Sequence, residues 1–263
     1  DQLIIKNSFK NLKTYLPDIK ELINFENHKI TIDYNKNNLN IKGEGKILGK
    51  DNLDVISYEV IKNNSKFRFN TKTKLKKNKL LIEFLDYEKK ENVNASIIIN
   101  GSFKNDNVIN FDLISLIEKN NKILFKNLNL SKDFKLISLD NFIFDYLNSH
   151  QIKNELFMKK NNLNYTIEGK NFDATELINK IMDNDSENSS SLSNFNSKIS
   201  LKIDRTYIDK VNFINNLSGV IEFKNNKIKD LNLQSIFPNN KKINLSIIKN
   251  DKKEKITKLF TDY

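Results

Sequence analysis

Cysteine and tryptophan are missing from this 263-residue chain, and proline (2), histidine (2) and glycine (6) are scarce. Without cysteine the chain has no disulfides, no thiolate metal site and no cysteine nucleophile. The two histidines, His28 and His150, lie far apart in the sequence and lack metal-type partners nearby, so we interpret both as ordinary surface or strand-end residues. No apolar run approaches the roughly 20 residues that a membrane-spanning helix needs.

Charge of both signs is spread along the chain. Lysine and arginine (44) outnumber aspartate and glutamate (33), which gives a formal net charge of +11. The lysines are interleaved with acidic residues, whereas nucleic-acid-binding surfaces cluster their positive charge. Lysine, asparagine and isoleucine also share A/T-rich codons, so genome composition is a sufficient reason for much of the bias. We therefore expect solvated faces and no nucleic-acid partner.

Apolar residues alternate with polar ones over most of the chain, which predicts strands. The pattern begins at His28 and runs through Ile30–Tyr34, an Asn-rich hairpin loop and Leu39–Ile47. It returns at Phe67–Leu75. Further strands are expected at Leu80–Phe84, Val93–Ile99, Val108–Leu113, Lys122–Leu130, Phe134–Leu139, Ile152–Met158, Leu163–Glu168, Ile199–Ile203, Leu217–Lys224, Ile228–Phe237, Ile243–Ile248 and Lys255–Phe260. Turns of two to five polar residues predict hairpin meanders rather than βαβ crossovers.

Helical periodicity is confined to short segments. Apolar residues recur every three or four positions from Phe9 to Ile23, with Pro17 dividing the pattern and a short helix expected at Ile19–Asn24. Phe111–Glu118 is compatible with either a short helix or a strand. Asp173 resembles an N-cap with Glu176 three residues later, which predicts a helix over 173–182.

A Ser/Asn/Asp-rich stretch follows that helix and reads as a flexible linker or exposed loop over 183–197. We therefore expect one β segment over 1–182, containing the short helices, and a second over 198–263.

Motifs for catalysis or cofactor binding are not recognisable. Gly43-x-Gly45 lacks the third glycine and the βα turn of a dinucleotide site, so a strand bend or bulge is the better interpretation. Asp183, Asp185 and Glu187 lack the glycine and terminal glutamate of a calcium loop. Phe67 and Phe69 flank Arg68, but they share the parity of the other core residues, which favours a core role over RNA stacking. We expect no enzyme activity, cofactor or metal.

The C-terminal half carries a series of short patterns in a fixed order. They are Gly169-Lys170-Asn171-Phe172-Asp173-Ala174, the linker, Ile199-Ser200-Leu201-Lys202-Ile203-Asp204, Leu217-Ser218-Gly219-Val220-Ile221 and a hairpin through Asn225-Asn226. Upstream, Ile97-Ile98-Ile99-Asn100-Gly101-Ser102-Phe103 has a strand followed by G-x-F. This order resembles the AsmA-like family of bacterial envelope proteins, which is related to TamB-like proteins. The resemblance covers about residues 90–263.

The resemblance implies a periplasmic protein, anchored to the inner membrane by a helix upstream of Asp1, whose stacked β repeats form a hydrophobic groove. Such a groove is expected to carry phospholipid, held by its acyl chains, between the two membranes of a Gram-negative envelope and so to support outer-membrane biogenesis. Outer-membrane or other envelope proteins are the expected protein partners.

The residues predict a mainly β fold with a few short helices, either a sandwich or barrel closing on itself or an open sheet. With the resemblance, we expect an elongated antiparallel sheet curved into an open, taco-like hydrophobic groove. The helices are too few to cover the apolar sheet face, so a second sheet or a ligand must cover it. The residues predicted to line the groove are Ile30, Ile32, Ile41, Phe67, Phe69, Ile97, Ile99, Leu201, Ile203, Ile243 and Leu245. Alternation alone also fits a structural β module with a closed, dry core, such as a surface or assembly protein.

Overall fold

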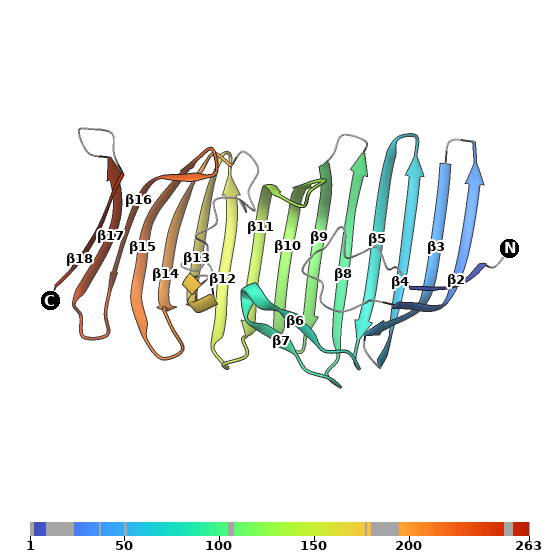
Figure 1. The fold of residues 1–263 in the computed structure, drawn as a ribbon, viewed down its shortest axis with the longest axis horizontal. Helices are drawn as coiled ribbons and strands as arrows, with labels where there is room; N and C mark the ends of the chain where they lie inside the picture. The colour runs from blue at the N-terminus through green and yellow to red at the C-terminus, as the bar shows by residue number, and fades with distance from the viewer. Residues whose placement is uncertain are drawn as a thin grey trace. The chain divides into compact units, whose positions relative to one another are not determined.

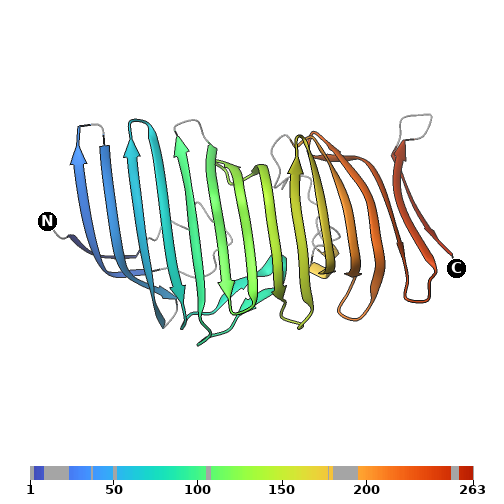
Figure 2. The ribbon, with the colours of Figure 1, turned by 180° about the vertical axis from the view of Figure 1, so that it is seen from behind.

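The computed structural model describes residues 3–8, 24–36, 38–49, 52–104, 108–176, 178–179, 195–249 and 255–262. These residues are mainly in β-strands, and they divide into two compact units. Unit 1 comprises Asp1–Leu81 and Glu88–Phe134, and unit 2 comprises Ile82–Tyr87 and Lys135–Tyr263. Each unit contains an open sheet whose strands follow one another in the order of the chain (Figures 1 and 2).

Unit 1 is an antiparallel meander, in which each strand pairs with its neighbours in the sheet. Its strands are β1 (Leu3–Ser8), β2 (Asn24–Asn35), β3 (Asn38–Gly49), β4 (Asn52–Asn63), β5 (Lys66–Leu75), β8 (Ala95–Lys104), β9 (Val108–Glu118) and β10 (Asn121–Ser131). Asn64, in the β4–β5 turn, has a φ of 53°, a left-handed conformation that asparagine tolerates better than most residues. Between β5 and β8 the chain forms a small hairpin of β6 (Leu80–Ile82), the 3₁₀ turn η1 (Glu83–Leu85) and β7 (Tyr87–Lys89).

Unit 2 is built in the same way, with one change of direction. Its strands are β11 (Leu136–Leu147), β12 (Lys153–Asn161), β13 (Asn164–Asp173), β14 (Ser197–Tyr207), β15 (Phe213–Lys224), β16 (Lys227–Ile236), β17 (Lys242–Lys249) and β18 (Lys255–Thr261). Asn225 and Asn226 both have positive φ, as the predicted two-residue turn between β15 and β16 requires. β13 and β14, however, are parallel. The antiparallel order is thus interrupted at this pair, between whose strands the sequence predicts a helix and a linker rather than a tight turn.

The long connection between the parallel strands begins with helical residues. Residues 175–176 and 178–179 are helical, and the amide of Ile178 donates to the carbonyl oxygen of Ala174 at 2.8 Å. Asp173 Oδ1 accepts a hydrogen bond from the amide of Thr175 at 3.0 Å, so Asp173 satisfies a free donor of the first turn. This confirms the start of the predicted helix, and the rest of it lies outside the described residues.

Several predicted boundaries need correction. β4 was not predicted at all, and β9 is one continuous strand, so a helix over Phe111–Glu118 is wrong. Phe84, predicted to end a strand, lies in η1 and is exposed. The predicted helix at Ile19–Asn24 lies outside the described residues except for Asn24, which begins β2.

The predicted linker also differs at its C-terminal end. Residues 183–194 lie outside the described part of the chain, but Phe195 is buried and packs against Tyr165 and Phe223, with ring centroids 5.6 and 5.4 Å away. β14 begins at Ser197. The division into compact units falls between Phe134 and Lys135 rather than at the linker.

Candidate functional site

The strand register of unit 1 places its apolar side chains in rows that cross the sheet on one face. Residues directly opposite one another in antiparallel strands project to the same face, so the partners can be followed from β2 to β10. The row through the predicted residues Ile32, Ile41 and Phe69 continues as Val60, Gly101, Phe111 and Leu128. We call this face the apolar face of unit 1.

Two further rows run beside that one. One consists of Ile30, Gly43, Tyr58, Thr71, Ile99, Ile114 and Phe125, and the next of Gly45, Ile56, Thr73, Ile97, Leu116 and Ile123. None of the three rows contains a lysine, arginine, aspartate or glutamate. The alternate residues of the same strands, such as Lys42, Glu59, Arg68 and Lys72, lie on the opposite face. The apolar face of unit 1 is thus uncharged across its middle.

Glycine makes room for two large polar side chains on this face. A Cβ atom built on Gly43 would lie 2.2 Å from the Tyr58 ring, and one on Gly45 would lie 2.2 Å from the His28 ring. The two glycines therefore admit overlying rings, and the expected bulge is found opposite Gly45. The irregularity in this pair lies on β2, between Glu26 and Lys29.

His28 is buried, with 2% of its surface exposed, so its interpretation as an ordinary surface or strand-end residue is wrong. Its Nε2 lies 3.1 Å from the carbonyl oxygen of Lys46 and its Nδ1 lies 3.3 Å from the Tyr58 hydroxyl. The carbonyl can only accept, so Nε2 donates, and in the neutral ring Nδ1 accepts the Tyr58 proton. Burial raises the pKa of Tyr58 above its ordinary value of 10.0, which keeps the hydroxyl a donor.

One end of the apolar face is closed by a buried polar cluster. Asp54 Oδ1 accepts the amides of Lys76 and Lys77 at 2.8 and 2.9 Å, while Oδ2 accepts the amide and the side-chain nitrogen of Asn78 at 2.9 and 2.8 Å. Lys89, which has no exposed surface, donates from Nζ to the carbonyl oxygens of Lys76 and Asn78. The carboxylate and the ammonium together fix the turn that follows β5.

The other end of the face is aromatic and partly exposed. Phe67 and Phe103 are stacked with ring centroids 4.6 Å apart and planes 4° from parallel. The centroid of the Phe69 ring lies 6.5 Å from that of Phe103 and 5.7 Å from that of Phe111, whose ring it meets edge-on. These side chains are half-buried or exposed, and the four rings form a continuous apolar surface.

Unit 2 carries an apolar face of its own. One row consists of Phe142, Met158, Ile167, Leu201, Gly219, Leu233, Leu245 and Leu259. Ile203 and Ile243 lie two residues from Leu201 and Leu245 on the same strands, so they share this face.

The eleven residues predicted to line a groove thus lie on one face within each unit: Ile30, Ile32, Ile41, Phe67, Phe69, Ile97 and Ile99 in unit 1, and Leu201, Ile203, Ile243 and Leu245 in unit 2. Ile30 and Ile203 are buried, Ile32 is 51% exposed, and the other eight are half-buried. Sequence reasoning missed the β4 residues Ile56, Tyr58 and Val60, together with Phe103 and Phe111. Phe103 is an even number of residues from Ile99 on β8, and Phe111 lies within the predicted strand Val108–Leu113, so the sequence did carry a signal for both.

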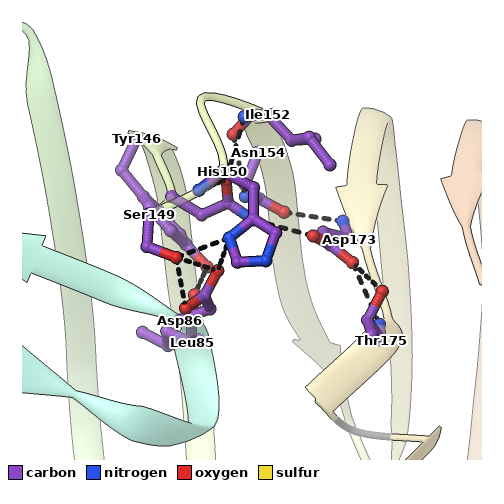
Figure 3. Close-up of polar contacts among 10 residues, drawn as sticks. Leu85, Asp86, Tyr146, Ser149, His150, Ile152, Asn154, Asp173 and Thr175 are labelled. Atoms are coloured by element: carbon purple, nitrogen blue, oxygen red, sulfur yellow. Dashed lines mark hydrogen bonds and ion pairs between the residues drawn. The ribbon is translucent and has the colours of Figure 1, made fainter. Parts of the chain in front are cut away.

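A serine, a histidine and an aspartate meet in unit 2 at the turn between β11 and β12 (Figure 3). Ser149 Oγ lies 2.7 Å from both carboxylate oxygens of Asp86 and 2.7 Å from His150 Nδ1, and that same Nδ1 lies 3.4 Å from Asp86 Oδ2. In a catalytic relay the imidazole stands between the other two groups and uses a different nitrogen for each. Here the serine bonds directly to the carboxylate, so the geometry is not that of a relay.

The backbone gives this cluster a structural role instead. The amide of Ser149 donates to the carbonyl oxygen of Asp86 at 2.8 Å, and Asn148 Oδ1 accepts the amides of His150 and Ile152 at 3.0 and 2.9 Å. Beneath it, Tyr146 donates its hydroxyl proton to the carbonyl oxygen of Leu85 at 2.8 Å. The cluster fastens residues 85–86 to the β11–β12 turn.

Neither a metal centre nor a membrane-crossing helix is found in the part of the chain that the structure describes. Within those residues, no group of three or more His, Asp and Glu side chains is placed to hold a metal ion. The same residues include no helix long and apolar enough to cross a bilayer. Comparison of the chain with protein-family models, curated proteins and solved structures gives no match.

Proposed function

We propose that the apolar faces bind the acyl chains of phospholipid, and that the protein is a non-catalytic periplasmic segment of an inner-membrane-anchored protein that conducts phospholipid towards the outer membrane. The observation that carries the acyl-chain proposal is the set of uncharged rows across unit 1. The rows through Phe69 and Ile99 consist mostly of half-buried side chains, whereas the next row is mostly buried beside them. Soluble proteins rarely leave a large contiguous apolar patch exposed unless it binds something.

The energetics favour a hydrocarbon ligand. Moving one methylene from water to an apolar surface contributes about 0.8 kcal/mol, so a long acyl chain gains affinity from area alone. Such binding needs no polar recognition motif, in agreement with the absence of charge from the three rows. The envelope location, the anchor and the direction of transport are proposed from the resemblance to AsmA-like proteins.

Changing Ile99 to aspartate should remove lipid that co-purifies with the chain, because a charge in the second row must then be buried beneath an acyl chain. The measurement is native mass spectrometry with lipid extraction of protein purified from a bacterial host. Ile98→Asp is the matched control, because Ile98 lies next to Ile99 on β8 and faces the opposite side of the sheet.

The expected result is bound phospholipid in the wild type and in Ile98→Asp, with loss of at least tenfold in Ile99→Asp, all three being folded by circular dichroism. A folded wild type that carries no lipid and takes none from vesicles would contradict the proposal and favour the structural β module.

A further inference from the structure

One row of described residues at the aromatic end of the apolar face of unit 1 includes a cation. The outermost row there consists of Tyr34, Leu39, Lys62, Phe67, Phe103, Ile109 and Leu130. Lys62 is the charged member of this row, and it is half-buried. It lies on the same face as the three uncharged rows rather than on the charged opposite face.

The surroundings of Lys62 are aromatic. Its Nζ lies 5.4 Å from the centroid of the Phe67 ring, which stacks on Phe103. No carboxylate pairs with Lys62 among the described residues. Lys42 on the opposite face is, by contrast, 3.2 Å from Glu59, and Lys160 in unit 2 is 3.4 Å from Asp140. The Lys62 ammonium is thus a positive charge beside an apolar surface.

The opposite end of the same face has acidic groups. Asp54 and Glu118 are both buried there together with the Lys89 ammonium, so two carboxylates face one cation. An anionic group approaching that end would meet negative charge in a poorly solvated place, which is unfavourable. The two ends of the apolar face therefore differ in charge.

We propose that Lys62 binds the anionic headgroup of an amphiphile whose hydrocarbon tail lies along the uncharged rows of unit 1. The proposal rests on the proposed acyl-chain function. It adds a preference for anionic ligands and an orientation of the ligand, with its headgroup at Lys62. An ammonium pairs with a phosphate or carboxylate oxygen, while Phe67 and Phe103 contact the first methylenes of the tail. An acidic phospholipid and a free fatty acid share this chemistry.

The test compares three ligands that carry the same fluorescent acyl label: phosphatidylglycerol, phosphatidylcholine and a free fatty acid. Fluorescence on binding is measured for the wild type, Lys62→Gln and Lys72→Gln. The Lys72 variant is the matched control, because it loses the same charge from an exposed site on the opposite face of β5. Binding is repeated at 0.5 M salt, which shortens the Debye length to about 4–5 Å and so weakens interactions between exposed charges.

The wild type and Lys72→Gln should bind phosphatidylglycerol about three- to fivefold more tightly than phosphatidylcholine, the range expected for one partly exposed charge pair. Lys62→Gln should bind the two equally, and salt should reduce the wild-type preference. The fatty acid shows whether a carboxylate serves as well as a phosphate diester. An unchanged preference in Lys62→Gln, or equal binding of both phospholipids by the wild type, overturns the headgroup site while leaving acyl-chain binding intact. Failure of the wild type to bind any of the three removes both proposals.

Discussion

Replacement of Asp54 with alanine should lower the free energy of unfolding of unit 1 by about 3–5 kcal/mol, because it removes the acceptor of several hydrogen bonds at once. The amides of Lys76, Lys77 and Asn78 would lose their partner, and the fully buried Lys89 would lose a nearby negative charge. Urea unfolding followed by far-UV circular dichroism measures the loss. Hydrogen exchange of peptides from β4 and β5 assigns it to unit 1, and normal protection there in the alanine variant would contradict the prediction.

The same carboxylate should make unit 1 sensitive to acid. Burial alone would raise the pKa of Asp54, but the hydrogen bonds from Lys77, Asn78 and Lys76 outweigh it and hold the pKa below the ordinary value of 3.8. A carboxyl whose pKa is lower in the folded state stabilises the fold above its unfolded pKa and loses that contribution as the pH falls through the folded value. The stability difference between wild type and Asp54→Ala should therefore be constant near neutral pH and shrink below about pH 4.

Replacement of Tyr146 with alanine should destabilise unit 2 by about 3–5 kcal/mol, the usual cost of removing a large buried aromatic ring. Tyr146 is 1% exposed. Its ring meets that of the fully buried Tyr87 edge-on, with ring centroids 5.7 Å apart, and its centroid lies 6.2 Å from that of Phe144. Burial, with the nearby carboxylates of Asp173 and Asp86, raises the pKa of Tyr146 well above 10.0, so its hydroxyl remains the donor to Leu85.

Two further substitutions serve as comparisons: one separates the effect of the Tyr146 ring from that of its hydroxyl, and the other is a control at an exposed site. Tyr146→Phe keeps the packing and loses one hydrogen bond, so it should cost about 1–2 kcal/mol. Leu163→Ala removes a side chain that is 75% exposed, in the turn between β12 and β13, and should change stability by less than about 0.5 kcal/mol. Equal losses for Tyr146→Ala and Leu163→Ala in thermal unfolding would show that Tyr146 does not anchor unit 2.

Strands were predictable wherever the two faces of the sheet differ in polarity. Phe67 and Phe69 alternate with Arg68 and Asn70, so β5 stands out in the sequence. β4 does not, because Val55 and Ile61 project to one face while Ile56 and Val60 project to the other. A strand that is apolar on both faces has no alternation to detect.

The apolar face itself was predictable in part. Residue parity assigns Ile97 and Ile99 to one face of β8, but only the pairing between strands shows that this face also holds Tyr58 and Phe111. The burial of His28 has the same origin, since it depends on Gly45 lying opposite. The parallel pairing of β13 with β14 could not be inferred, because local alternation is the same in parallel and antiparallel strands.

The parallel pair also bears on the order in which unit 2 folds. Tyr165 pairs with Ile199, 34 residues later, whereas neighbouring hairpins such as Asn161 with Asn164 close over three residues. Loop-closure entropy makes the longer closure costlier by about 2 kcal/mol. We infer that β11–β13 and β14–β18 form first as separate local meanders and join late along β13. Pulsed hydrogen exchange would show β14 amides on the β13 side protected last, and simultaneous protection of both edges of β14 would refute this order. Pairing of β13 with β14 is then the slowest step in forming the apolar face of unit 2.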